Sequence, residues 1–188
     1  MKLFPYAASV ALALALGAPA QAQTLVPKGS EIVFVSKQMG VPVEGRFKTF
    51  SLPGFAFNPK QPQAAKVQIN INLASADMGA ADVEAELLKP EWLDSKRRPE
   101  ATFVAQSVKA LGAGKFELTG PFTLKGQTKP MTVQLTLTQA GGTSTATGQF
   151  NIKRTEWAIG AGEWADTSIV AADVAVRFKF LFSGMAPL

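Results

Sequence analysis

Apolar and polar residues alternate along most of this chain. Four segments keep an apolar face of one parity over their whole length: 67–73, 116–124, 131–137 and 174–182. Successive side chains of a strand point to opposite faces, so each segment predicts a strand with one buried face. Less regular alternation predicts further strands at residues 31–38, 43–50, 101–108 and 143–154. The pattern therefore predicts about eight strands of ordinary length.

One stretch lacks this alternation and predicts a helix. It runs from Ala80 to about Asp94 and is rich in alanine, glutamate and leucine. Pro90 should end or kink the helix because proline lacks a backbone N–H, and residues 91–93 should then form a separate turn. Glycines at 112–114 and 141–142 predict tight turns between neighbouring strands.

Eight short strands with one apolar face close into a barrel or stack as a sandwich. Gly45, Gly120 and Gly148 lie inside strand patterns, where a barrel wall bends or another backbone comes close. Closure removes exposed strand edges, and the cysteine–tryptophan–cysteine pattern of immunoglobulin sandwiches is missing. An all-β barrel is therefore favoured. An outer-membrane barrel fits less well, because of the helical stretch and the long excursion from residue 73 to 101.

The first 22 residues predict a secretory signal peptide. Lys2 supplies a positive start, Ala7 to Leu16 an apolar core, and Ala20-Gln21-Ala22 a cleavage motif. The apolar run of about ten residues is roughly half of a membrane-spanning helix. Residues 23–188 then form one domain, large enough for a hydrophobic core without disulfides. We expect a periplasmic protein.

The formal net charge of +5 is compatible with binding to nucleic acid or to an anionic membrane. The basic residues are scattered, however, and the one tight cluster, Lys96-Arg97-Arg98, fits a solvated loop better than a phosphate-binding patch. We expect no nucleic-acid partner and at most a transient contact with a membrane surface. The oligomeric state is left open, a homodimer included.

The composition removes most catalytic chemistry. The chain contains no histidine and no cysteine, and therefore lacks the commonest general base, the commonest metal ligand and a thiolate nucleophile. Gly160-Ala161-Gly162 precedes no helical pattern, so it does not indicate a dinucleotide site. The acidic side chains fall mostly in the predicted helix and loops. We expect neither an enzyme nor a metal site.

Phenylalanine is abundant, with thirteen residues spread over nearly every predicted strand. Each one taken alone is best explained as part of the core. Small eight-stranded barrels, however, either fill with side chains or hold one ligand. Periodicity leaves both arrangements open.

From Ser30 onward the chain resembles the YceI-like family of periplasmic polyisoprenoid-binding proteins. The resemblance rests on the order and spacing of several motifs. These are Gly45-Arg46-Phe47, Phe57-Asn58-Pro59, Trp92-Leu93-Asp94 with Pro99 and Phe103, and the segments 120–130 and 150–160. The chain departs from the family pattern at residues 74–79 and at Ala158, where a glycine is common.

The resemblance implies a lipocalin-like, extended antiparallel β-barrel with one covering helix. Its long apolar pocket would hold an isoprenoid chain, of a quinone or a polyprenyl lipid, or another long-chain lipid, with no further cofactor. The predicted cavity lining is Phe34, Phe47, Phe57, Phe103, Phe122, Phe150, Ile152, Phe178 and Phe180. The predicted headgroup contacts are Arg46, Arg154 and Asp166. An ion pair between Arg154 and Asp166 that closes the barrel end is an equally good interpretation of those two residues.

Burial of about twenty ligand carbons gains roughly 16 kcal/mol, against an association cost of about 4–15 kcal/mol. An apolar tunnel alone is therefore sufficient to hold such a chain. The leading hypothesis is a periplasmic carrier or sequestering protein for isoprenoid lipids. Two alternatives stay open: a stress-related interaction module with a filled barrel, and a hydrolase that uses Glu163 and Asp166.

Overall fold

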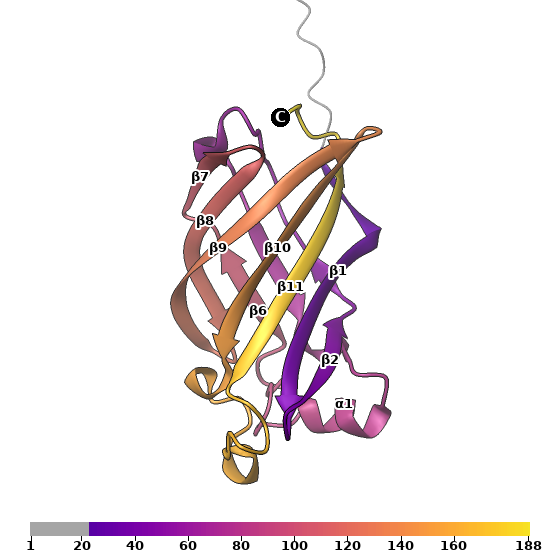
Figure 1. Cartoon of the computed structure of the whole chain (residues 1–188), viewed down its shortest axis with the longest axis vertical. Helices are drawn as coiled ribbons and strands as arrows, with labels where there is room; N and C mark the ends of the chain where they lie inside the picture. Colours follow the sequence, from indigo (N-terminus) through magenta and orange to yellow (C-terminus); the bar gives the residue numbers. More distant parts are fainter. Residues whose placement is uncertain (1–22) are drawn as a thin grey trace, which may run out of the picture.

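The computed structural model describes residues 23–188, so the predicted signal peptide lies outside the described residues. Eleven strands form one antiparallel sheet that curls into a tall half-barrel (Figure 1). The strands are β1 (Thr24–Gln38), β2 (Val41–Phe47), β3 (Phe50–Ser51), β4 (Gln68–Asn72), β5 (Ala76–Asp77), β6 (Glu100–Val104), β7 (Ser107–Gly112), β8 (Lys115–Leu124), β9 (Gln127–Ala140), β10 (Thr143–Lys153) and β11 (Asp173–Ser183). The helical elements are α1 (Ala81–Leu87) and the 3-10 turns η1 (Pro62–Ala64), η2 (Leu73–Ser75), η3 (Arg154–Trp157) and η4 (Gly162–Trp164).

The strands follow the order β3-β4-β6-β8-β9-β10-β11-β1-β2-β5, with β7 paired to β8 beside this path. β2 pairs with β1, and β3, which follows β2 in the chain, pairs with β4. Between them, Lys48 N donates to Ser75 O (3.1 Å), and Asn72 N donates to Thr49 O (3.0 Å). The two ends of the strand order therefore meet. The strands form a single curled sheet instead of two stacked sheets, which confirms the predicted barrel and not the sandwich.

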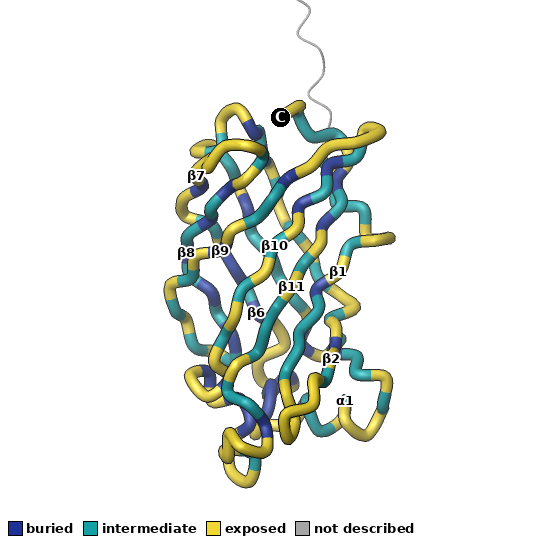
Figure 2. Tube along the Cα trace, viewed as in Figure 1, coloured by how far each residue is buried: buried dark blue, intermediate teal, exposed yellow. Residues whose placement is uncertain are grey.

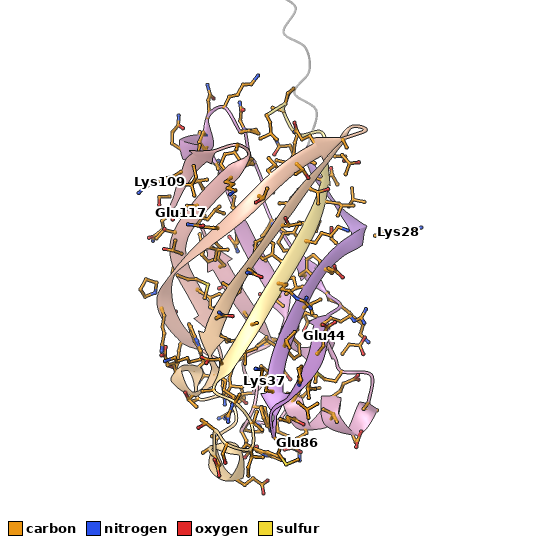
Figure 3. The ribbon with its side chains drawn as sticks, viewed as in Figure 1. Lys28, Lys37, Glu44, Glu86, Lys109 and Glu117 are labelled. Atoms are coloured by element: carbon orange, nitrogen blue, oxygen red, sulfur yellow. The ribbon has the colours of Figure 1, made fainter. Side chains whose placement is uncertain are left out.

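The apolar face that alternation predicts lies inside the barrel. Every second residue of β8 from Phe116 to Leu124 is buried, and over much of β10 and β11 more buried positions alternate with more exposed ones (Figure 2). Lys28 and Lys109 point away from the barrel into solvent (Figure 3). This arrangement is the reverse of an outer-membrane barrel, whose apolar face is turned toward lipid.

The number of strands differs from the prediction because strand pairing is interrupted within predicted segments. Residues 101–108 form β6 and β7 instead of one strand, because the pairing with β8 shifts by one residue between Phe103, opposite Phe122, and Ser107, opposite Thr119. β1 begins at Thr24 instead of Glu31, and a register shift after Val26 hides the alternation there.

The helix is shorter than predicted. α1 ends at Leu87, because Lys89 precedes Pro90 and the residue before a proline disfavours helical backbone. Leu93 N then donates to Leu87 O (2.9 Å) and Asp94 N to Lys89 O (2.9 Å), which forms the separate turn that the sequence predicts. α1 lies at one end of the barrel, called the lower end from here on (Figure 1).

Gly45, Gly120 and Gly148 lie at inward-facing positions of their strands, and close neighbours occupy the space of a side chain at each. A Cβ atom on Gly120 would lie 1.9 Å from a backbone oxygen. The rings of Phe34 and Phe178 lie 2.4 Å and 2.3 Å from where a Cβ would stand on Gly45 and Gly148. The predicted close approach of another backbone is confirmed at Gly120 and at Gly148, where Gln134 O lies 2.6 Å from the Cβ position, whereas the close neighbours of Gly45 are side chains. Gly45 and Gly148 make room for aromatic rings inside the barrel.

Replacing Gly120 by Ala should destabilise the fold, because the new methyl group would meet Val104 O at 1.9 Å. We expect the free energy of unfolding in urea to fall by about 1–3 kcal/mol or more. Thr119→Ala, at the outward-facing neighbour in β8, is the control and should cost less than about 1 kcal/mol. Equal stability of Gly120→Ala and the wild type would show that the strands tolerate a side chain there.

Candidate functional site

The lower part of the barrel encloses a cavity of about 410 Å³. Residues of β1, β2, β4, β6, β8, β10 and β11 line its walls, and residues of α1 and of the turn after it also contribute to the lining. The lining is mostly apolar. The volume lies in the range of about 300–1,000 Å³ that is typical of small-molecule sites. This cavity is the candidate functional site.

A second cavity of about 90 Å³ lies higher in the barrel, and its lining is entirely apolar. Two of its lining residues, Phe55 and Phe182, stack with ring centroids 4.4 Å apart. Five residues line both cavities and define a level that we call the waist: Ile32, Ile71, Phe122, Phe150 and Val176. The interior is therefore two chambers that meet at the waist.

All nine apolar residues of the predicted lining face these chambers. Eight of them lie on strands and follow the inward parity of their strand, whereas Phe57 lies in the loop that follows β3. Phe34, Phe47 and Ile152 line the lower cavity, Phe57, Phe103, Phe178 and Phe180 line the upper one, and Phe122 and Phe150 line both. Contact of these residues with a ligand stays a prediction.

Several lining residues were not predicted. Ser36 and Gln38 share the inward parity of Phe34 on β1, so extending the alternation along this strand would have found them. Trp92 and Trp164 also line the lower cavity but come from irregular segments. Sequence periodicity carries no information on side-chain direction in such segments.

Arg154 lines the lower cavity and is one of the most buried side chains, at 1% exposed. Burial lowers the pKa of its guanidinium, yet arginine stays protonated in proteins. Within residues 23–188 no carboxylate forms an ion pair with it, so the predicted pair with Asp166 is wrong. Its guanidinium donates instead to four backbone carbonyls: Ala171 O (3.1 Å), Ile159 O (3.0 Å), Gly160 O (2.9 Å) and Val170 O (2.6 Å).

Three buried polar groups on lining residues of this cavity lack a hydrogen-bond partner in the described part of the chain. They are the Ser36 hydroxyl and the indole N–H groups of Trp92 and Trp164. The two indole rings lie 5.6 Å apart, and the guanidinium carbon of Arg154 lies 6.0 Å from the Trp92 ring centre. Buried polar groups are nearly always hydrogen-bonded, and leaving one unpaired costs about 1–3 kcal/mol. The unpaired N–H groups of Trp92 and Trp164 therefore favour a ligand with acceptor atoms. These two residues and the neighbouring Arg154 are called the donor cluster below.

Arg46 and Asp166 lie away from the cavity. Arg46 faces outward from β2 with its side chain 63% exposed, and its Nε lies 4.0 Å from a carboxylate oxygen of Asp77. Asp166 accepts hydrogen bonds from the hydroxyl and the backbone N–H of Ser168, which lower the pKa of its carboxyl. Of the three predicted headgroup residues, Arg154 lines the cavity and these two do not. Glu163 and Asp166 are both exposed and line neither cavity.

The Asp94 carboxylate holds the turn at the lower end. Asp94 is 3% exposed, and its carboxylate oxygens lie 3.0 Å from Arg97 Nε and 3.5 Å from Arg98 Nε. The hydrogen bond from Arg97 lowers the pKa of the Asp94 carboxyl. Two arginines of the cluster 96–98 thus pair within the fold, which disfavours a phosphate-binding role for it.

Charged groups also stand at the lower end of the cavity. Asp82 and Glu86 of α1 contribute to its lining, and Glu86 pairs with Lys89.

Residues 23–188 contain no group of three or more acidic, histidine or cysteine side chains arranged to hold a metal ion. Within the same range, every helix is too short or too polar to cross a membrane.

The sequence profile of the YceI-like domain matches residues 23–182. The chain belongs to the YceI-like family. A UPF0312 protein of Vibrio parahaemolyticus is 34% identical over 142 residues, which cover 74% of this chain and 75% of the relative. A UPF0312 protein of Shewanella sp. is 40% identical over 92 residues, or 49% of this chain and 48% of the relative. The latter match spans about half of each protein.

Solved structures of the same architecture confirm the lipocalin-like fold of this YceI-like chain. BcnA of Burkholderia cenocepacia superposes with a TM-score of 0.80 at 38% identity, over 84% of this chain and 99% of BcnA. A polyisoprenoid-binding domain of Saccharophagus degradans, described as implicated in plant cell wall breakdown, gives a TM-score of 0.69 at 18% identity. That match covers 88% of this chain and 99% of the domain, and it shows the fold alone.

One departure of this YceI-like chain from the family pattern has a visible structural effect. Ala158 ends η3 with a φ of +53°, a left-handed conformation that glycine adopts without steric cost. Its carbonyl oxygen accepts a hydrogen bond from Lys125 Nζ (2.5 Å), which holds the loop beside β8. The departure therefore adds local strain to the loop.

Replacing Arg154 by Met should leave four buried or half-buried carbonyls without their donor. We expect the free energy of unfolding to fall by about 3–5 kcal/mol, as when one partner of a buried polar network is removed. Arg177→Met is the control, since Arg177 is exposed and its pair with Glu44 (2.7 Å) is worth at most about 1 kcal/mol. Similar midpoints in urea for both variants would refute the anchoring role of Arg154.

Replacing Asp94 by Asn removes the charge but keeps a residue that tolerates the positive φ of 52° found there. The pKa of the Asp94 carboxyl is lower in the folded protein than its ordinary value of 3.8. The ionised carboxylate therefore stabilises the fold above pH 3.8, and this stabilisation is lost as the pH falls from there through the lower pKa of the folded protein. We expect a lower Tm for the variant at pH 7 and a smaller further loss of Tm between about pH 4 and pH 2. Thermal unfolding followed by circular dichroism measures both, and parallel Tm profiles would contradict this account.

Proposed function

We propose that this YceI-like protein is a periplasmic binding protein that holds the chain of an isoprenoid lipid, a quinone or a polyprenyl lipid, in its lower cavity. The observation that carries the proposal is the apolar cavity of about 410 Å³ beside buried donors that have no partner. A dry protein cavity of about 150 Å³ accepts benzene, or about 25 Å³ per carbon atom. The lower cavity therefore has room for about 16 carbon atoms, or three isoprene units. A barrel filled with side chains would leave no such space.

The apolar lining supplies enough free energy for this role. Transfer of about 16 carbons from water gains roughly 13 kcal/mol, and association costs about 4–15 kcal/mol. Binding by the lining alone is therefore favourable when the association cost lies below about 13 kcal/mol, and over that span it ranges from weak to tight. Hydrogen bonds at the headgroup then decide the orientation of the lipid and add to its affinity.

The donor cluster supports a headgroup that carries acceptor atoms. A quinone carbonyl or a phosphate oxygen would give Trp92 or Trp164 the partner that it lacks, and the buried charge of Arg154 would strengthen that contact. The polyisoprenoid-binding domain of Saccharophagus degradans has the same fold, which agrees with this assignment.

A binding role without catalysis is supported by the lack of histidine and cysteine in the sequence and by the exposed positions of Glu163 and Asp166. The predicted signal peptide of residues 1–22 supports a periplasmic location.

The direct experiment is extraction of the mature protein, purified from its natural host, with organic solvent. Mass spectrometry of the extract should show an isoprenoid lipid in near-stoichiometric amount. Recovery of no lipid, together with no uptake of added quinone or prenol by the extracted protein, would overturn the proposed function.

Replacing Val43 by Trp should block binding, because Val43 is half-buried and lines the lower cavity, where a larger side chain has room. We expect quinone affinity to fall by about tenfold or more, a loss of at least ~1.4 kcal/mol, with little change in Tm. Val41→Trp is the matched control, because Val41 lies on the same face of β2 but is 63% exposed and lies outside the cavity. Equal quinone affinity of the two variants in an equilibrium titration would argue against binding in this cavity.

A further inference from the structure

We propose that Phe122 and Phe150, the aromatic pair at the waist, set the length of lipid chain that the barrel accepts. The inference rests on the proposed function and adds a specificity-determining element to it. Both residues line both cavities. A chain that enters from the lower cavity must pass these rings to reach the upper one.

The two rings are held differently. Phe122 is 6% exposed and meets the Trp157 ring edge-on at 5.4 Å, and Trp157 is itself 3% exposed. Phe150 is half-buried and meets Phe122 at 6.2 Å with the ring planes at 70°. Within residues 23–188 this is the one aromatic contact that Phe150 makes. Phe122 is thus the more firmly packed side of the waist, and Phe150 is the less firmly packed side.

The volume of each chamber predicts the length of lipid chain above which the chain has to pass the waist. At about 25 Å³ per carbon, the lower cavity holds about 16 carbon atoms and the upper cavity about four. A chain of three isoprene units therefore fills the lower cavity, and a fourth unit has to pass the waist or stay outside. The upper cavity is lined by apolar groups alone, so it suits the hydrocarbon end of a chain and no headgroup.

A substitution at Val176 can change the width of the waist in the direction opposite to removal of the Phe150 ring. Val176 faces both cavities, and it is the register partner of Phe150 on the neighbouring strand β11. Removing the Phe150 ring widens the passage, whereas a phenylalanine at position 176 narrows it.

The test is a titration of the delipidated mature protein with farnesol and geranylgeraniol, prenols of three and four isoprene units. Tryptophan fluorescence reports binding, because Trp92 and Trp164 line the lower cavity. In Phe150→Ala we expect the ratio of geranylgeraniol to farnesol affinity to rise by about tenfold over the wild type, and in Val176→Phe to fall below it. Gln149→Ala is the control, since Gln149 is the exposed neighbour of Phe150 on β10 and lines neither cavity, and its ratio should stay within about threefold of the wild type. Phe178→Ala, which enlarges the upper cavity at a residue that does not line the lower one, tests the effect of chamber volume and should raise the ratio by less than Phe150→Ala.

An unchanged ratio in Phe150→Ala, with farnesol binding intact, overturns the gate and leaves the proposed function standing. A rise in Phe178→Ala as large as in Phe150→Ala also overturns it, because chamber volume alone would then explain selectivity. If Phe150→Ala does not fold, the ratio in Val176→Phe decides, and a ratio at or above that of the wild type overturns the gate. If the wild type binds neither prenol nor quinone, the proposed function itself fails.

Discussion

Four hydrogen bonds from one buried guanidinium hold the lower end of the barrel together. Arg154 follows β10 directly, and its acceptors lie in the connection between β10 and β11, at residues 159–160 and 170–171. Backbone carbonyls in such a connection need partners that a sheet does not supply. Arginine provides several donors in one rigid, planar group. A single side chain thereby fastens this end without filling it, and the space above stays open.

The upper end is closed by aromatic packing. Phe55 stacks on Phe182 at 4.4 Å, and Phe57 meets Phe116 edge-on at 5.0 Å. Contacts of this kind add to the burial of large apolar surfaces. The same curled sheet therefore carries a nearly filled core above and a cavity below, with the waist between them. This division makes the protein suited to a ligand with a long apolar part and a polar end.

The candidate site was predictable where it lies on regular strands. Eight of the nine predicted apolar lining residues lie on strands and face the two chambers because alternation is local and each strand keeps its parity. Arg46 was predicted as a headgroup contact from its place beside a family motif, yet its inward neighbours Gly45 and Phe47 put it on the outer face. Trp92 and Trp164 were missed because no periodicity gives the direction of a side chain in a turn.

The sequence by itself determined which face of each strand is apolar, where glycines admit close neighbours, and that histidine and cysteine chemistry is excluded. Each of these depends on residue type and on spacing over a few positions. Tertiary structure alone decided the volume of the cavity, the four partners of Arg154 and the meeting of Phe122 with Phe150. A cavity is the difference between the space that a curled sheet encloses and the volume of the side chains inside it. That difference depends on register and closure between strands far apart in the chain, which local patterns do not contain.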